Sequence, residues 1–197
     1  MKKSTLILLG VLGIIVLFVL WGVGQYNKLF SLNQGVESLW GEVQNQYQRR
    51  MDLIPNLVST VKGFAAQEKQ VLLGVTEARA SVGKMTVTKE VLDDPELFAK
   101  FQGAQDQLSS ALQRLLVVTE NYPQLKSNEN FLSLQNQLEG TENRITVARG
   151  RFNQEVQQYN TARGRFPGVL IANVAGFRER PYFKAKEGAE TPPEVKF

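Results

Sequence analysis

The chain has 197 residues, of which 43% are hydrophobic and 21% charged, and its formal net charge is +4. It contains no histidine and no cysteine, which excludes Ser-His-Asp and Cys-His catalysis, His- or Cys-ligated zinc, and disulfides. The small positive charge does not indicate nucleic-acid binding. The composition therefore indicates one folded domain behind an apolar front segment, and we expect neither an enzymatic centre nor a cofactor.

The front segment predicts a transmembrane helix that is retained as a signal anchor. Residues 4–27 carry no charge, and residues 6–20 are almost entirely Leu, Ile, Val, Phe and Gly. About 19 apolar residues suffice to cross the hydrocarbon core of a bilayer. Residues 22–24 (Gly-Val-Gly) also resemble a signal-peptide cleavage site, but the bulky Trp21 precedes them and the helical pattern continues. Three residues are expected at the membrane interface: Trp21, Tyr26 and Lys28.

The distribution of positive charge predicts the orientation. Lys2 and Lys3 lie on the short side of the apolar run, and only Lys28 lies close to it on the far side. The positive-inside rule places residues 1–4 in the cytoplasm, the anchor at residues 5–24 and the bundle in the periplasm of a bacterial inner membrane. The opposite orientation, with the bundle in the cytoplasm, is the alternative.

The anchor passes directly into an amphipathic helix, with apolar residues at steps of three and four from Leu29 to Tyr47. Residues 49–57 (RRMDLIPNL) then predict a tight reversal between antiparallel helices, because Pro55 disfavours helical geometry at Ile54 and suits the first turn of a new helix. The polar residues at the reversal are either turn and capping residues, which is the favoured interpretation, or a subunit contact. The set is Arg49, Arg50, Asp52, Pro55 and Asn56.

Three further long helices and one short helix follow. The pattern predicts a second helix up to Gly83, a third that begins at Asp94-Pro95 and carries Gln105 on an exposed face, and a fourth from about residue 131 to residue 163. Residues 169–177 predict a small helix that packs on the bundle, and residues 184–197 predict a disordered tail. The fold class is thus all-α: a transmembrane helix continuous with an antiparallel up-down four-helix bundle, coiled-coil-like and spanning residues 25–183.

Charged residues on or beside the apolar stripes predict a polar network. The four residues are Glu68, Arg79, Glu142 and Arg149. An interhelical network that fixes the packing of the bundle is favoured over a carboxylate pair for acid–base or metal chemistry, since no cluster of His, Cys or Asp accompanies them.

A basic cluster lies near the end of the last long helix and after it. Its four arginines either contact anionic lipid headgroups or form an ordinary solvated surface. They are Arg163, Arg165, Arg178 and Arg180.

Several of these pieces together resemble the LemA family of bacterial membrane-anchored helical proteins. The pieces are RRMDLIPNLV at residues 49–58, Ala78-Arg79, Tyr122-Pro123, Glu142, Ala148-Arg149, Tyr159-Asn160 and Tyr182-Phe183. Two departures stand out, since Gln67 precedes Glu68 where the family often has His, and Phe152-Asn153 stands where the family has Tyr-Asn. The resemblance implies a helical bundle behind an N-terminal transmembrane helix. Family descriptions often place the short N-terminus outside, opposite to the charge-based orientation.

The functional expectation is a non-enzymatic scaffold that binds the lipid bilayer, forms a homo-oligomer and organises the cell envelope. The alternative is an adaptor that binds another envelope protein, a membrane enzyme or a transporter, through a groove of the bundle.

Overall fold

The computed structural model describes residues 3–85 and 89–185, and within these ranges the regular structure is helical without a β-strand. The helices are α1 (Lys3–Phe64), α2 (Lys69–Gly83), the short 3-10 helix η1 (Lys89–Leu92), α3 (Pro95–Thr119), α4 (Pro123–Lys126), α5 (Glu129–Gly164) and α6 (Gly168–Ala175). An extended segment, residues 177–185, follows the last helix. The all-α class is therefore confirmed.

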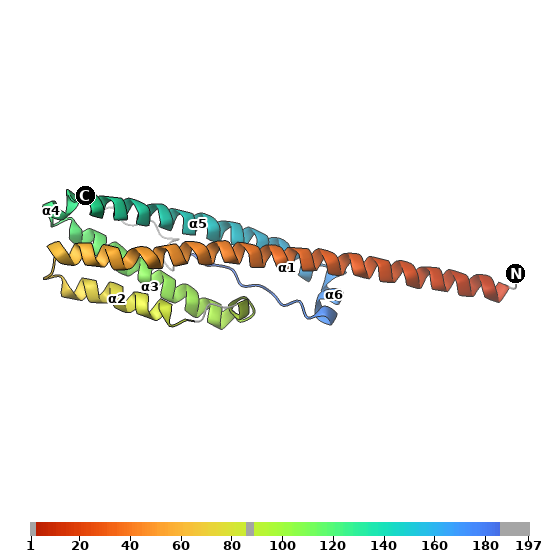
Figure 1. The fold of residues 1–197 in the computed structure, drawn as a ribbon. Coiled ribbons are helices and arrows are strands. Elements are labelled where there is room, and N and C mark those ends of the chain that lie inside the picture. Colours follow the sequence, from red (N-terminus) through yellow and green to blue (C-terminus); the bar gives the residue numbers. More distant parts are fainter. Residues whose placement is uncertain (1–2, 86–88, 186–197) are drawn as a thin grey trace, which may run out of the picture.

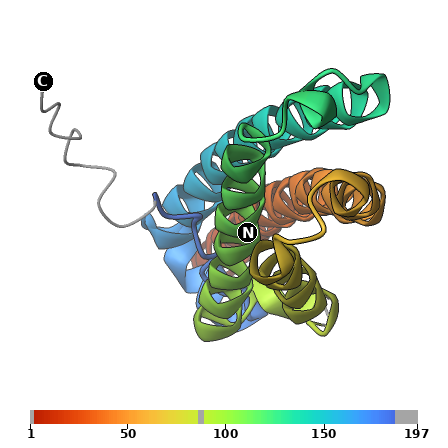
Figure 2. The same ribbon diagram turned by 90° about the vertical axis from the view of Figure 1, so that its left-hand side faces the viewer.

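The long helices pair closely. α1 packs mainly against α5, which runs back along it, and α2 packs mainly against α3 (Figure 1). Figure 2 shows the same helices from the end at which α1 passes into α2. α6 contacts both α1 and α5 at the opposite end of the bundle.

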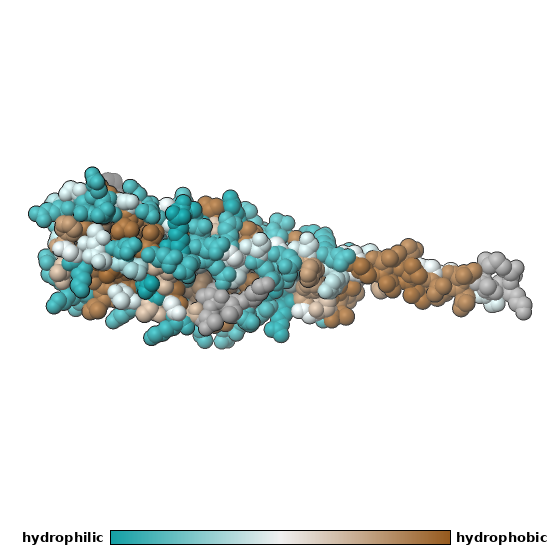
Figure 3. Space-filling model, viewed as in Figure 1, coloured by the Kyte–Doolittle hydropathy of each residue, from teal (hydrophilic) through white to brown (hydrophobic). Residues whose placement is uncertain are grey.

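The N-terminal part of α1 projects beyond the rest of the molecule (Figure 1). Its large apolar side chains between Ile7 and Leu20 are 50–69% exposed, because no other helix covers them. Figure 3 shows this rod as a continuous hydrophobic surface. By length and composition it can cross a membrane, and exposed apolar surface of this extent is characteristic of a membrane segment. The chain is a membrane-associated protein with one candidate span.

Beyond the projecting part, α1 forms one wall of the core. Leu29, Val36, Trp40, Val43 and Tyr47 are each at most 4% exposed. Two clusters of buried side chains fill the bundle. One cluster surrounds Trp40 and is rich in aromatic rings, and the other is mainly aliphatic and lies farther from the projecting end.

The predicted reversal at residues 49–57 is wrong. α1 continues through Pro55 to Phe64, and the chain turns at residues 65–68 instead. Proline inside a helix costs about 3 kcal/mol. Ile54, Leu57 and Val61 are at most 1% exposed, and burying three such side chains contributes more, at about 1.5–3 kcal/mol each.

A side chain from α2 binds the carbonyl group that Pro55 leaves without a hydrogen-bond donor. In a regular helix the N–H at position 55 would bond to the carbonyl of Met51, and proline has no N–H. Arg79 Nε donates to this Met51 oxygen at 3.3 Å. The second helix is consequently α2, which begins at Lys69, well after the predicted start.

Other predicted helix ends agree with the structure in part. Asp94 caps α3 through bonds to the N–H groups of Glu96 and Leu97, as predicted, and Pro95 occupies the first helical position. Gly83 is the last helical residue of α2 and not a left-handed cap, a role that Gly176 (φ 76°) fills after α6. The predicted start of the tail at residue 184 is too early, because both backbone groups of Lys184 are bonded to Gln102 of α3. The rest of that tail from residue 186, and residues 1–2 of the predicted cytoplasmic end, lie outside the described residues.

We expect Arg79→Met to lower the free energy of unfolding by about 1 kcal/mol, because the Met51 carbonyl loses its partner. In the Pro55→Ala background the same substitution should cost clearly less, since the restored N–H at position 55 can bond to Met51. A double-mutant cycle from denaturant unfolding of the detergent-solubilised protein measures the difference. Equal losses in the two backgrounds would contradict the compensation.

Candidate functional site

The most deeply buried charge of the described chain is Arg50, which is 1% exposed. Its Nη1 donates to Ser109 Oγ at 2.6 Å on α3 and to Glu142 Oε1 at 2.9 Å on α5. Its Nη2 donates to the side-chain oxygen of Gln105 and, at 3.4 Å, to the Gln105 carbonyl. These four residues, Arg50, Gln105, Ser109 and Glu142, are called the Arg50 centre, and they join α1, α3 and α5 at one level of the bundle.

The Arg50 centre lies between the two core clusters. Along α1 it follows Tyr47 of the aromatic cluster and precedes Ile54 of the aliphatic cluster. The Arg50 guanidinium also lies over the Tyr47 ring, 5.1 Å from its centroid. Gln105, which the sequence pattern placed on an exposed face, is 2% exposed, because its amide accepts from the guanidinium.

Tyr47 is a neutral phenol at physiological pH. Burial raises its pKa to about 12, although the nearby positive charges of Arg149 and Arg50 act in the opposite direction. Its hydroxyl has no hydrogen-bond partner among the described residues. A phenol with this pKa stays protonated near neutral pH, so Tyr47 does not act as a general base there.

Each of the four residues of the predicted polar network has a different partner, and no two of them pair with one another in the described structure. Glu142 binds Arg50, and Arg149 Nη1 lies 3.3 Å from Asp106 Oδ1. Arg79 binds the Met51 carbonyl, and Glu68 accepts a bond of 2.8 Å from the Tyr122 hydroxyl, which raises the pKa of Tyr122. Each of them thus connects two segments of the bundle.

The residues of the predicted reversal separate into one buried and four exposed positions. Arg50 is buried, whereas Arg49, Asp52, Pro55 and Asn56 are exposed along α1. Asp52 accepts a bond from Gln48 at 2.8 Å, within the same helix. The role of Arg50 had a signal in the sequence, because position 50 continues the buried spacing of positions 43, 47, 54 and 57.

The extended segment of residues 177–185, called the strap here, runs back along the bundle and is held by side-chain amides. Asn160 Oδ1 accepts from the N–H of Arg180 at 3.0 Å, and its Nδ2 donates to the Arg180 carbonyl at 2.8 Å. Asn153 makes the same pair of bonds with Phe183, both at 2.9 Å. Gln102 on α3 does so with Lys184, at 3.1 and 2.9 Å. Three amides therefore replace the strand partner that an extended backbone otherwise needs.

Two side chains of the strap enter the bundle. Phe183 is 6% exposed and lies within 4.8–6.1 Å, between ring centroids, of Phe98, Phe152 and Trp40. The guanidinium of Arg149 covers its ring at 4.5 Å. Arg180 is 8% exposed, donates to Asn33 Oδ1 at 2.8 and 3.1 Å, and pairs with Asp93.

The predicted basic cluster is correspondingly divided. Arg180 is buried against Asn33 and Asp93, and Arg163 Nε donates to the Phe177 carbonyl at 2.9 Å. Neither guanidinium is a free headgroup ligand, because each holds the strap in place. Arg165 and Arg178 remain exposed.

The expected interface residues lie where the projecting rod enters the bundle. Trp21 is half-buried and packs beside Phe18, with ring centroids 5.5 Å apart. Tyr26 is 43% exposed and lies 5.6 Å from the Phe177 ring, and Lys28 is exposed.

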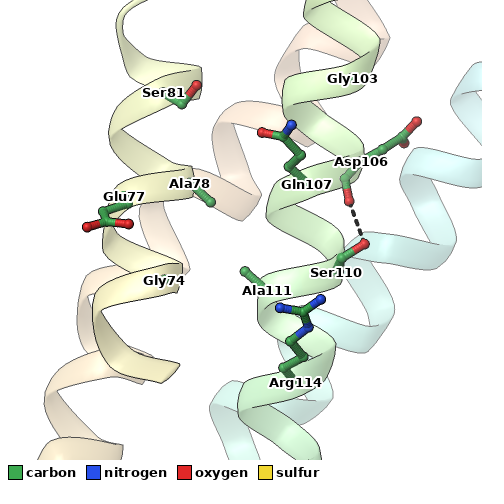
Figure 4. Close-up of a pocket in the computed structure, with 10 residues that line it drawn as sticks. All are labelled: Gly74, Glu77, Ala78, Ser81, Gly103, Asp106, Gln107, Ser110, Ala111 and Arg114. Carbon is green, nitrogen blue, oxygen red and sulfur yellow. Dashed lines mark hydrogen bonds between the residues drawn. The ribbon is translucent and has the colours of Figure 1, made fainter. Parts of the chain in front are cut away.

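An open groove of about 690 Å³ lies between α2 and α3. Figure 4 shows small residues on both walls, and the Ser110 hydroxyl on α3 donates to the Asp106 carbonyl. The residues that line it are Gly74, Glu77, Ala78, Ser81, Gly103, Asp106, Gln107, Ser110, Ala111 and Arg114. It contains no pair of nucleophile and base, and across residues 3–85 and 89–185 no three carboxylates gather as metal ligands.

Comparisons with known proteins point to one family. A family model, described as the LemA family, matches residues 39–197. Magnetosome protein MamQ of Magnetospirillum gryphiswaldense is 25% identical over 194 residues, which cover 90% of this chain and 71% of that protein. The proteins MamQ 2 and MamQ 1 of Paramagnetospirillum magneticum are each 24% identical, and the match again covers 90% of this chain and 71% of the relative.

We expect Glu142→Ala to lower the free energy of unfolding by about 2 kcal/mol, because it leaves the buried Arg50 without its counter-charge. The value lies below the roughly 3–5 kcal/mol lost when a fully buried pair is broken, since Ser109 and Gln105 still bind Arg50 and Glu142 is partly hydrated. Glu42→Ala is the matched control, since it removes the exposed pair with Arg151 and should cost less than about 0.5 kcal/mol. Denaturant unfolding measures both, and equal losses would contradict the role of the centre.

We expect Asn153→Ala to destabilise the protein by about 2 kcal/mol, because the two backbone groups of Phe183 lose their partners. The strap should also be cut faster by a protease that acts after Lys or Arg. Gln154→Ala, an exposed neighbour on the same helix, is the control and should change neither property. Unaltered cleavage of the Asn153→Ala protein would show that the amide does not hold the strap.

Proposed function

This chain belongs to the LemA family, and from that premise we propose that it is a non-enzymatic scaffold which self-assembles at the bacterial inner membrane and organises the envelope. In this proposal residues 5–24 of α1 are the anchor, and residues 25–183 form an antiparallel up-down four-helix bundle. The bundle boundary at residue 183 includes Phe183, which is the last side chain to enter the core within the described part of the chain, residues 3–85 and 89–185.

The continuity of α1 is the observation that carries the proposal. One helix extends from Lys3 to Phe64, so the exposed apolar rod and the wall of the core are a single element. A flexible linker would let a bundle rotate freely on its tether. A continuous helix instead transmits the position of the span to the bundle, which suits a protein that arranges others in the membrane plane.

The chemistry of the bundle supports a non-enzymatic role. The chain has no histidine or cysteine, the buried Tyr47 stays neutral, and the charged side chains of the Arg50 centre are bound to one another. These groups hold helices together and leave no free nucleophile beside a base.

The α2–α3 side of the bundle is the surface that we propose for lateral assembly. It combines the small-residue groove with exposed apolar side chains, since Leu73 on α2 is 57% and Val117 on α3 is 64% exposed. Small residues allow two helices to approach closely, and exposed apolar side chains beside them add area to a contact. An unlike membrane protein that fills the same groove with a helix would make the chain an adaptor.

For the orientation we propose a cytoplasmic N-terminus and a periplasmic bundle. The support is the charge distribution around the span, with Lys2 and Lys3 on the short side and Lys28 on the other. Trp21 and Tyr26 then lie at the outer interface, close to the bundle.

Mass measurement of the protein extracted gently from membranes tests the assembly. We expect a complex of several copies, and Leu73→Glu with Val117→Glu should shift it to monomers by placing charges in the contact. The control is Leu132→Glu on α5, which is 43% exposed but lies outside the groove. A monomer at native concentration would contradict self-assembly, and a stoichiometric unlike partner would favour the adaptor.

Cysteine labelling tests the orientation, because the native chain has no cysteine to interfere. With a reagent that does not cross the inner membrane, Gln154→Cys on α5 should react once the outer membrane is opened. Ser4→Cys, at the other end of the span, should react only after the inner membrane is ruptured. The reverse pattern would refute the periplasmic placement.

A further inference from the structure

Residues 166–177 (FPGVLIANVAGF) form an uncharged run between Arg165 and Arg178, with Asn173 as the only polar side chain. α6 lies within this run. Twelve residues are too few to cross a bilayer, and an apolar segment of this length is typical of a core helix or of an interfacial helix. The exposure of its side chains decides between these two types.

One side of α6 is packed and the other is open. Gly168 and Ala172 are buried, and Gly168 lies so close to α5 that a Cβ atom there would be 2.4 Å from the Ala162 carbonyl oxygen. On the open side Phe166, Leu170 and Val174 are 81%, 51% and 90% exposed. Leu170 and Val174 lie one turn apart on one face of α6, and Phe166 lies in the turn just before this helix. A core helix would not leave this face uncovered, so the run has the form of an interfacial helix.

The position of α6 along α1 matches the membrane surface. The Ile171 side chain comes within 3.8 Å of the site where Gly22 would carry a Cβ, and the Phe177 ring lies 5.6 Å from that of Tyr26. Lys28, the first charge after the span, is six residues beyond Gly22, or about 9 Å along the helix. α6 therefore lies beside the part of α1 where the apolar rod ends and charge begins. Figure 3 shows hydrophobic surface at this end of the bundle, next to the rod.

We propose that Phe166 and α6, together called the foot, dip into the boundary between headgroups and acyl chains as a second membrane contact of this protein. The bilayer is the occupant because the exposed face continues the apolar surface of the span. The exposed charges of Arg165, Arg178 and Lys28 flank it at the level of anionic headgroups.

The foot gives the bundle two points of attachment. A single span allows the bundle to rotate about the helix axis and to tilt, whereas a second contact beside it selects one side of the bundle to face the lipid. This inference rests on insertion of α1 in the bilayer and does not depend on self-assembly or on the absence of catalysis.

Depth-dependent quenching on the full chain, reconstituted in vesicles that contain anionic lipid, tests the foot. An environment-sensitive fluorophore is placed at Val174→Cys, and two reference sites are Val16→Cys in the span and Val147→Cys on α5, both exposed. Quenchers attached to lipids near the headgroups should reduce the Val174→Cys emission by about half or more. Quenchers deep in the acyl chains should act on Val16→Cys, and aqueous iodide should act strongly only on Val147→Cys.

Three results would overturn the proposal. Iodide quenching of the Val174→Cys label as strong as that of the Val147→Cys label would place the face in water. Protection from both the headgroup quenchers and iodide would show a protein partner on the face in place of lipid. Absence of quenching at Val16→Cys by the quenchers deep in the acyl chains would show that α1 is not inserted, which removes the premise and the anchor together.

A second experiment distinguishes a foot that holds the bundle in one orientation from a foot that only lies near the bilayer. Polarised infrared dichroism of oriented bilayers reports how uniformly the long helices are aligned. We expect the Phe166→Ser, Leu170→Ser and Val174→Ser triple variant to lose alignment while it stays in the membrane through α1. The control, Phe64→Ser with Leu132→Ser and Val147→Ser, alters exposed apolar residues outside the foot and outside the proposed assembly surface and should keep the alignment. Unchanged alignment in the foot variant would refute the second contact.

Discussion

The structure depends on α1 remaining one helix in two different surroundings. In the hydrocarbon core of a membrane a helix satisfies its own backbone groups, so the exposed apolar rod is self-sufficient there. Farther along, the same helix must present a buried stripe to α5, and it does so from Leu29 through Val61. The two surroundings require only a change of side chains, from apolar all round to apolar on one face. The backbone can therefore pass from one to the other without a break.

The features that could interrupt this helix are compensated by its neighbours. Pro55 frees the Met51 carbonyl, and Arg79 from α2 occupies it. Arg50 would be a costly buried charge, and α3 and α5 supply Gln105, Ser109 and Glu142 around it. Because these partners come from other elements, they set the level at which each helix packs along α1. Apolar contacts alone would tolerate a shift by one turn more easily than these directed bonds do.

The strap extends the same principle to a segment without regular structure. Asn160, Asn153 and Gln102 each bond both backbone groups of one residue, and Phe183 fills the space among the rings of the core. The strap thus joins the foot at the membrane to the aromatic cluster around Trp40. Through it and through α1, the bundle is tied to the membrane-proximal end along two separate paths.

The sequence by itself determined the elements whose signals are local. The uncharged apolar run showed the span, steps of three and four showed the helical class, and Asp94-Pro95 showed the start of α3. Tertiary structure decided what depends on partners distant in sequence. The reversal was misplaced, because a local rule about Pro55 cannot account for Ile54 and Leu57 being buried or for Arg79 reaching Met51. Gln105 was assigned to the surface, because a polar residue is usually exposed unless a charge such as Arg50 meets it inside. The bonds between the strap and the amides, and the open face of α6, were also inaccessible, because the sequence does not state which side of a short apolar helix is covered.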